Sequence, residues 1–93
     1  MESSVTRNDL AGRYELTVDD RVVGVADFRV EGDRVVMPHT VIDPARRGQG
    51  LAAVLVAAAL EDIRQAGRTV VPACWYVAQY LDAHPEQADL IAD

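Results

Sequence analysis

The segment from His39 to Leu60 constrains the fold more than any other part of this 93-residue chain. An alternating segment ends at Ile42, and the turn Asp43-Pro44 and a glycine-containing basic loop follow it. The next ten residues, Leu51 to Leu60, are apolar on nearly every side of a helix. A period of two indicates a strand, and an apolar run of this kind indicates a deeply packed helix. Unpaired N–H groups at such a helix start, together with the helix dipole, form an anion site.

The loop between this strand and this helix has the composition of a pyrophosphate site. Gly48 and Gly50 let the main chain approach a phosphate closely, because no Cβ stands in the way. Arg46 and Arg47 add guanidinium donors that suit phosphate oxygens. The chain has a formal net charge of −6, so this basic loop contrasts with its surroundings. We therefore expect the arginines to serve binding.

The rest of the chain predicts a single domain, residues 1–93, of the α+β (α/β) class, with residues 1–8 as a flexible tail. Alternation of apolar residues indicates an antiparallel meander, and the helix after it leads to a short strand that pairs in parallel with the third strand. A C-terminal helix ends before Pro85. The expected strands are Arg13–Val18, Arg21–Val30, Arg34–Ile42 and Val70–Pro72, and the expected helices are Gly50 to about Ala66 and Trp75–Ala83, with a last helical turn in Ala88–Asp93.

Charge and composition exclude several classes of protein. The net charge of −6 argues against nucleic-acid binding, which needs a basic face. The apolar run is too short to span a bilayer, and the first residues lack the features of a signal peptide. The single cysteine, Cys74, cannot form an internal disulfide. We expect a cytoplasmic protein with no membrane or nucleic-acid partner and no metal site.

Two known phosphate-binding loops fit the sequence poorly. A P-loop needs a Lys and a Ser or Thr after its second glycine, and neither is present. The spacing Gly48-x-Gly50-x-x-Ala53 satisfies the looser dinucleotide fingerprint. That fingerprint expects a strand directly before its first glycine, whereas residues 44–47 intervene here.

A third loop type fits better. The run V-x-x-P-x-x-R-G-x-G-x-A-x-x-L, from Val41 to Leu55, resembles the acetyl-CoA-binding motif of the GNAT N-acetyltransferase superfamily, although Ala45 stands where that motif has Gln or Arg. Pro72-Ala73-Cys74 and the segment Tyr80–Glu86, with its His-Pro-Glu ending, are similar to the small YjdJ-like branch of GNAT-related proteins. The resemblance covers about residues 20 to 90.

The resemblance implies a sheet splayed between Val35–Ile42 and Val70–Pro72, with acetyl-CoA in the opening. Larger members have an extra N-terminal strand and helices that wall the acceptor site, and residues 1–12 are too short for both. We therefore expect an open acceptor site, or one completed by a partner protein or by a second copy paired at the edge strand Arg13–Val18. The residues expected to hold acetyl-CoA are Val41, Ile42, Arg46, Arg47, Gly48, Gln49, Gly50, Leu51 and Ala52.

Three side chains are candidates for the chemistry. His39 lies just before the loop, and a neutral imidazole can take the proton of an amine, although it could also serve only as a strand residue. Cys74, after the parallel strand, is either a nucleophile or a small buried residue walled by Trp75 and Tyr76. The resemblance implies that Tyr80 protonates the CoA thiolate, its alternative role being core packing.

These residues predict an N-acetyltransferase that transfers an acetyl group directly to an amine, either a small molecule or a protein. Two alternatives stay open. One is a non-catalytic acyl-CoA sensor or partner-docking module. The other is acyl transfer through Cys74.

Overall fold

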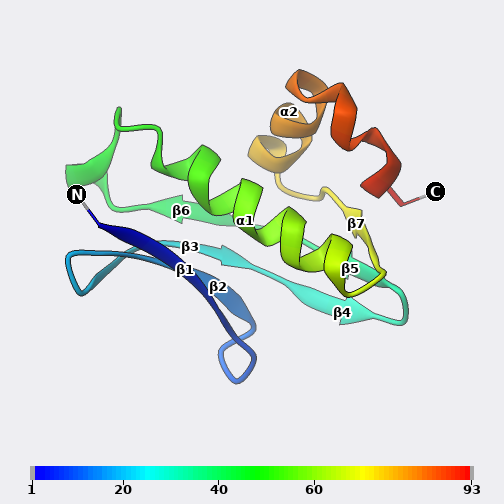
Figure 1. Ribbon diagram of the computed structural model, residues 1–93, viewed down its shortest axis with the longest axis horizontal. Helices are drawn as coiled ribbons and strands as arrows, with labels where there is room; N and C mark the ends of the chain where they lie inside the picture. Colours follow the sequence, from blue (N-terminus) through cyan, green and yellow to red (C-terminus); the bar gives the residue numbers. More distant parts are fainter. Residues whose placement is uncertain (1, 93) are drawn as a thin grey trace.

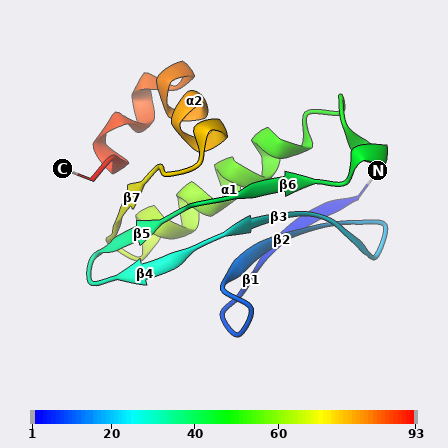
Figure 2. The ribbon, with the colours of Figure 1, turned by 180° about the vertical axis from the view of Figure 1, so that it is seen from behind.

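Figure 1 shows the computed structural model of the protein, which describes residues 2–92. Helix α1 lies across one face of the strands, and Figure 2, seen from behind, shows strands β3 to β6 in front of it. The predicted α+β class is confirmed. The strands are β1 (Ser3–Asn8), β2 (Arg13–Val18), β3 (Arg21–Asp27), β4 (Arg29–Glu31), β5 (Arg34–Val36), β6 (Thr40–Ile42) and β7 (Thr69–Val71), and the helices are α1 (Leu51–Gln65), α2 (Trp75–Ala83) and the 3₁₀ turns η1 (Pro44–Arg46) and η2 (Pro85–Leu90).

The strands form two sheets. The first is antiparallel, with the order β1-β2-β3-β6, and the second has the order β4-β5-β7. Strand β5 pairs with β7 in parallel, with Val35 opposite Val70. Because α1 connects β6 to β7, this parallel pair confirms the predicted crossover. Helix α2 has the predicted bounds, and α1 begins at Leu51 after the N-cap residue Gly50.

Two predicted strands are each divided in the structure, and this division splays the sheet. The segment Arg21–Val30 is interrupted at Phe28, and the segment Arg34–Ile42 is interrupted at residues 37–39. The β5–β7 ladder extends to Met37, whose amide donates to the carbonyl of Val71 at 3.1 Å. Pro38 has no N–H to continue the ladder. Beyond it, β6 pairs with β3 alone, and the main chain after β7 turns away into α2.

The N-terminal segment differs from the expected flexible tail. Ser3–Asn8 forms β1 and pairs with β2 along its whole length, while Met1 lies outside the described residues. Its side chains are mostly exposed, so the sequence lacks an apolar pattern, but backbone pairing at a sheet edge needs none. An N-terminal strand is therefore present, contrary to expectation, and β1 covers the edge of β2 that we expected to be open.

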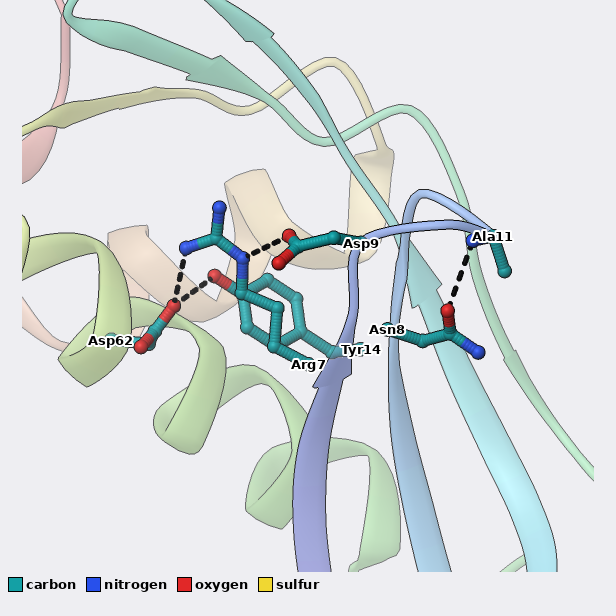
Figure 3. Close-up of polar contacts among 6 residues, drawn as sticks. All are labelled: Arg7, Asn8, Asp9, Ala11, Tyr14 and Asp62. Atoms are coloured by element: carbon teal, nitrogen blue, oxygen red, sulfur yellow. Dashed lines mark hydrogen bonds and ion pairs between the residues drawn. The ribbon is translucent and has the colours of Figure 1, made fainter.

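Strand β1 is also fastened to α1 by side chains, which Figure 3 shows. Asp62 of α1 accepts hydrogen bonds from the Tyr14 hydroxyl at 2.7 Å and from Nη1 of Arg7 at 3.2 Å. Nε of Arg7 donates to Asp9 at 2.6 Å, and its guanidinium lies 5.2 Å from the ring centre of Phe28. Burial, followed by the hydrogen bond to Asp62, raises the pKa of Tyr14. This cluster therefore joins the edge of the first sheet to the helix.

We expect a double-mutant cycle on Tyr14 and Asp62 to show a coupling of about 1.5 kcal/mol in the free energy of unfolding, because the acceptor of this hydrogen bond is charged. The cycle compares Tyr14→Phe, Asp62→Ala and the double variant with the parent by urea denaturation. Additive losses would contradict the assigned contact.

The core lies between α1 and the sheets and is apolar: among residues 2–92, no polar or charged side chain is buried. Gly24 of β3 stands beneath α1, where an added Cβ would lie 2.5 Å from Cδ1 of Ile42 and 3.5 Å from Cδ2 of Leu55. A glycine at this position therefore leaves room for the Ile42 side chain of the neighbouring strand β6. Neither helix of the described residues is long and apolar enough to cross a membrane.

The C-terminal residues fold back on α1 and β7. The helical turn expected in Ala88–Asp93 lies earlier, as η2, and Asp93 is outside the described residues. Arg64 of α1 donates to Asp89 at 2.7 Å and to Gln87 at 2.8 Å. The amide of Ala92 donates to the carbonyl of Val70 at 2.8 Å, so the end of the chain continues the second sheet beside β7.

Candidate functional site

The loop before α1 is shaped by one capped turn and two glycines. The Asp43 carboxylate accepts a hydrogen bond from the amide of Ala45 at 3.0 Å and thereby caps η1. Gly48 and Gly50 then have φ angles of +82° and +73°, which favour glycine. No atom lies within 4 Å of the place where a Cβ would stand on either glycine. The main chain is therefore open to a ligand at both positions.

The amides of this loop are available to an anion. No oxygen of residues 2–92 accepts a hydrogen bond from the backbone N–H groups of residues 48–53. The first helical bond runs from Val54 to Gly50 at 3.4 Å, and Gly50 has no side chain to cap the helix. The free N–H groups and the positive end of the dipole of a 15-residue helix thus coincide.

A hollow of about 140 Å³ lies against this helix start. Seven of the predicted binding residues line it, together with two residues outside that set, Ala53 and Tyr76. The seven are Ile42, Arg46, Arg47, Gly48, Gly50, Leu51 and Ala52. Val41 and Gln49 are exposed and lie outside the lining. Tyr76 enters because α2 begins opposite the start of α1, an arrangement that no local sequence pattern reveals.

Cys74 is the N-cap residue of α2 and lies where the sheets part. Its amide donates to the carbonyl of Met37 at 2.8 Å, and its Sγ contacts Oγ1 of Thr40 at 3.7 Å. Burial acts to raise the pKa of the thiol. Hydrogen bonds from the amides of Val77 and Tyr76 and from Thr40 outweigh burial, and the pKa lies below its ordinary value.

His39 immediately precedes β6 and Thr40. Its side chain is 74% exposed, and its Nδ1 lies 3.7 Å from Oδ2 of Asp27, beyond hydrogen-bond distance. Its carbonyl accepts a hydrogen bond from the Asp27 amide at 2.9 Å, which fixes the backbone against the end of β3. The backbone of His39 is thus fixed, whereas its imidazole ring is exposed to solvent.

Tyr80 lies farther along α2 and does not line the hollow. Its ring stacks on His84 at 3.9 Å between centroids, and Nδ1 of His84 lies 2.7 Å from the Tyr80 carbonyl. Burial, and then the charge of Glu86 and the nearby Tyr76, raise the pKa of Tyr80, so its hydroxyl stays protonated at neutral pH. His84 is the C-cap residue of α2, as its position before Pro85 predicts.

The structure therefore forms two groups of candidate residues. The loop residues and Tyr76 surround the hollow. Thr40 contacts Cys74 where the two sheets part. His39 adjoins the second group through Thr40, whereas Tyr80 packs with His84. The contact of Thr40 with Cys74 is absent from the sequence-based interpretation, since the two residues are 34 positions apart.

Two solved structures share this fold. One is the ribosomal-protein-S18-alanine N-acetyltransferase of Escherichia coli, with a TM-score of 0.65 and 20% identity over 77% of this chain. This chain spans half the length of that enzyme. The other is a GCN5-like protein of Staphylococcus aureus studied by NMR, with a TM-score of 0.73 and 15% identity, covering 96% of this chain and 87% of the other. No curated protein matches the chain.

A family model assigns the chain to a family, which the two solved structures, at 20% and 15% identity, do not do alone. Residues 13–90 match the model described as GCN5-related N-acetyl-transferase. The match covers both the loop before α1 and the segment through Cys74 and α2. It agrees with the family to which the sequence motifs point. The chain belongs to the GCN5-related N-acetyltransferases.

Proposed function

We propose that this protein binds acetyl-CoA and transfers its acetyl group to an amine by direct attack. The observation that carries the proposal is the set of unpaired amides at the start of α1, between two glycines with positive φ and beside Arg46 and Arg47. A helix start of this kind suits a pyrophosphate. Membership of the family supports acetyl-CoA as the molecule that carries it.

The residues present fit such a ligand. The space beside Gly48 and Gly50 is open, and a phosphate could occupy it because neither residue has a side chain there. The amides of residues 48–52 would hold the pyrophosphate, and Arg46 and Arg47 would balance its charge. Strand β6 pairs with β3 on one side only, so its other edge, at Val41 and Ile42, is open to an extended ligand.

Acetyl-CoA, when bound, supplies an activated thioester. The exposed imidazole of His39 would accept the proton that the attacking amine must lose. The Tyr80 hydroxyl, which its raised pKa keeps protonated, and the Cys74 thiol are the candidate donors of a proton to the departing sulfur. Of these two, Cys74 lies where the two sheets part and Tyr80 lies farther along α2.

The lowered pKa of Cys74 favours a second route, in which the thiolate attacks the thioester. A bond would form between Sγ and the acetyl carbon, the bond from that carbon to the CoA sulfur would break, and CoA would leave and take up a proton. An amine would then remove the acetyl group from Cys74 and restore the thiol. Mass spectrometry of a quenched reaction distinguishes this route, because the protein then gains one acetyl group.

The acceptor is a small amine or an exposed protein amine. The net charge of −6 favours a cation, since a protonated amine is attracted to an acidic surface. Between β1 and β2 the chain makes only a short turn, in which the amide of Gly12 donates to the carbonyl of Asn8 at 2.9 Å. No helix of the described residues lies between these two strands, and a partner protein or a second copy would complete the acceptor site.

We expect calorimetric titration to show micromolar binding of acetyl-CoA and no binding of NADH, which shares the pyrophosphate but not the pantetheine. With a panel of small amines and lysine peptides, the enzyme should release free CoA faster with one amine than in buffer alone. Binding without amine-dependent release would favour the sensor. Absence of acetyl-CoA binding would refute the proposal.

A further inference from the structure

The thiol of Cys74 has a side-chain partner outside its own helix, and this contact crosses the line at which the two sheets part. Cys74 follows β7 and caps α2, whereas Thr40 begins β6 in the other sheet. Their side chains meet at 3.7 Å, Sγ to Oγ1, within the range of a hydrogen bond to sulfur. Among the described residues, this is the side-chain hydrogen bond that links β6 of the first sheet to the segment after β7 of the second sheet.

We propose that Thr40 is a positioning residue that holds the Cys74 sulfur at the opening of the splay and stabilises its thiolate. In the thiol form, S–H donates to Oγ1 of Thr40. When the proton leaves, the hydroxyl can turn and donate to the sulfur instead, because it is both donor and acceptor. A valine at this position would keep the branched shape that suits a strand and would lose only the hydroxyl.

The surroundings of the sulfur support this role. The largest contributions to the pKa of Cys74 are burial, which raises it, and hydrogen bonds from α2 and Thr40, which lower it. The amides of Tyr76 and Val77 belong to the helix and remain in any Thr40 variant. The nearest titratable residues along the chain are His39, which immediately precedes Thr40 and whose ring lies beside Asp27, and Tyr76, which follows Cys74 on α2. Thr40 is thus the side chain through which β6 acts on the thiol.

The titration of Cys74 tests the proposal without acetyl-CoA or an acceptor. Cys74 is the only cysteine in the sequence, so the rate of alkylation by iodoacetamide, followed by intact mass, reports on it alone. We expect Thr40→Val to move the midpoint of the pH–rate curve to a pH about one unit higher, the effect of losing one hydrogen bond to a charged group. Below the midpoint, the rate should fall about tenfold relative to the parent. Thr40→Ser keeps the hydroxyl and should restore the parent midpoint.

Thr6→Val is the matched control, because Thr6 is an exposed strand residue of β1. It should leave the curve unchanged. An unchanged midpoint in folded Thr40→Val, or a shift that Thr40→Ser does not reverse, would overturn the proposal. Circular dichroism checks folding, and Thr40→Ala replaces Thr40→Val in the same test if the valine variant does not fold.

The part that Thr40 plays in transfer rests on the function proposed above, whereas its control of the thiol does not. Where acetyl transfer is measurable, Thr40→Val should lower kcat and leave the KM for acetyl-CoA unchanged, because Thr40 is absent from the lining of the hollow. A shifted titration curve in a protein that does not bind acetyl-CoA would refute the proposed function alone. Normal binding with an unshifted curve would refute the role of Thr40 alone.

Discussion

Arg47→Ala combined with Gly50→Asp should weaken acetyl-CoA binding by more than about 100-fold, because a carboxylate among the free amides repels a phosphate and competes for its donors. Aspartate is among the residues that tolerate a positive φ, so the fold should survive at Gly50, where φ is +73°. Calorimetry measures the binding, and thermal denaturation measures the stability. Normal affinity in a folded double variant would show that the loop is not the binding site.

The β4–β5 turn offers a matched control for this experiment. Gly32 has a φ of +66° and, like Gly50, has no atom within 4 Å of an added Cβ. Arg34 is exposed at the start of β5, directly after the same turn. Arg34→Ala with Gly32→Asp therefore changes the net charge and the backbone strain in the same way, away from the loop. This control should bind acetyl-CoA as the parent does, which separates the local effect from the effect of overall charge.

Leu55→Ala should lower the free energy of unfolding by about 3 kcal/mol and the Tm by about 15 °C. Leu55 is fully buried on α1, and its Cδ2 lies against Gly24 of β3. The substitution leaves a cavity between the helix and the sheet, and Gly24 has no side chain with which to fill it. Urea denaturation at a fixed temperature measures the loss.

The neighbouring residue provides the control for this substitution. Val54 is 43% exposed on the same turn of α1. Val54→Ala should change the free energy of unfolding by no more than about 0.5 kcal/mol, since alanine also favours the helix. Equal losses in the two variants would show that α1 does not pack on the sheet in the described orientation.

The sequence predicts the parts of this fold that repeat a local pattern. The bounds of α2, the start of α1 and the parallel pairing of β5 with β7 follow from apolar periodicity, glycine and proline. Strand β1 has no such pattern, because an exposed edge strand is held by its backbone and by contacts such as that of Arg7 with Asp62. These contacts depend on residues far away in the chain, so no window of sequence contains them.

In the candidate site, too, local sequence patterns predict some residues, and only the fold reveals the others. The loop glycines and arginines are recognisable because their chemistry lies within five consecutive residues, 46–50. Tyr76 and Thr40 are ordinary residues of a helix and a strand until the fold places them beside the hollow and the thiol. The break after Met37 depends on one proline, Pro38, which the alternation on either side of it conceals.

Met37 stands where a rotation of one sheet against the other would have its pivot. Its amide is bound to Val71 and its carbonyl to the amide of Cys74, and beyond these two bonds β6 pairs only with β3. A rotation about this point displaces each residue in proportion to its distance from it, and a strand lengthens that distance by about 3.3 Å per residue. Thr40 lies near the pivot and the loop lies far from it. A rotation of β6 about Met37 would therefore move the loop more than Thr40, the residue in contact with the Cys74 sulfur.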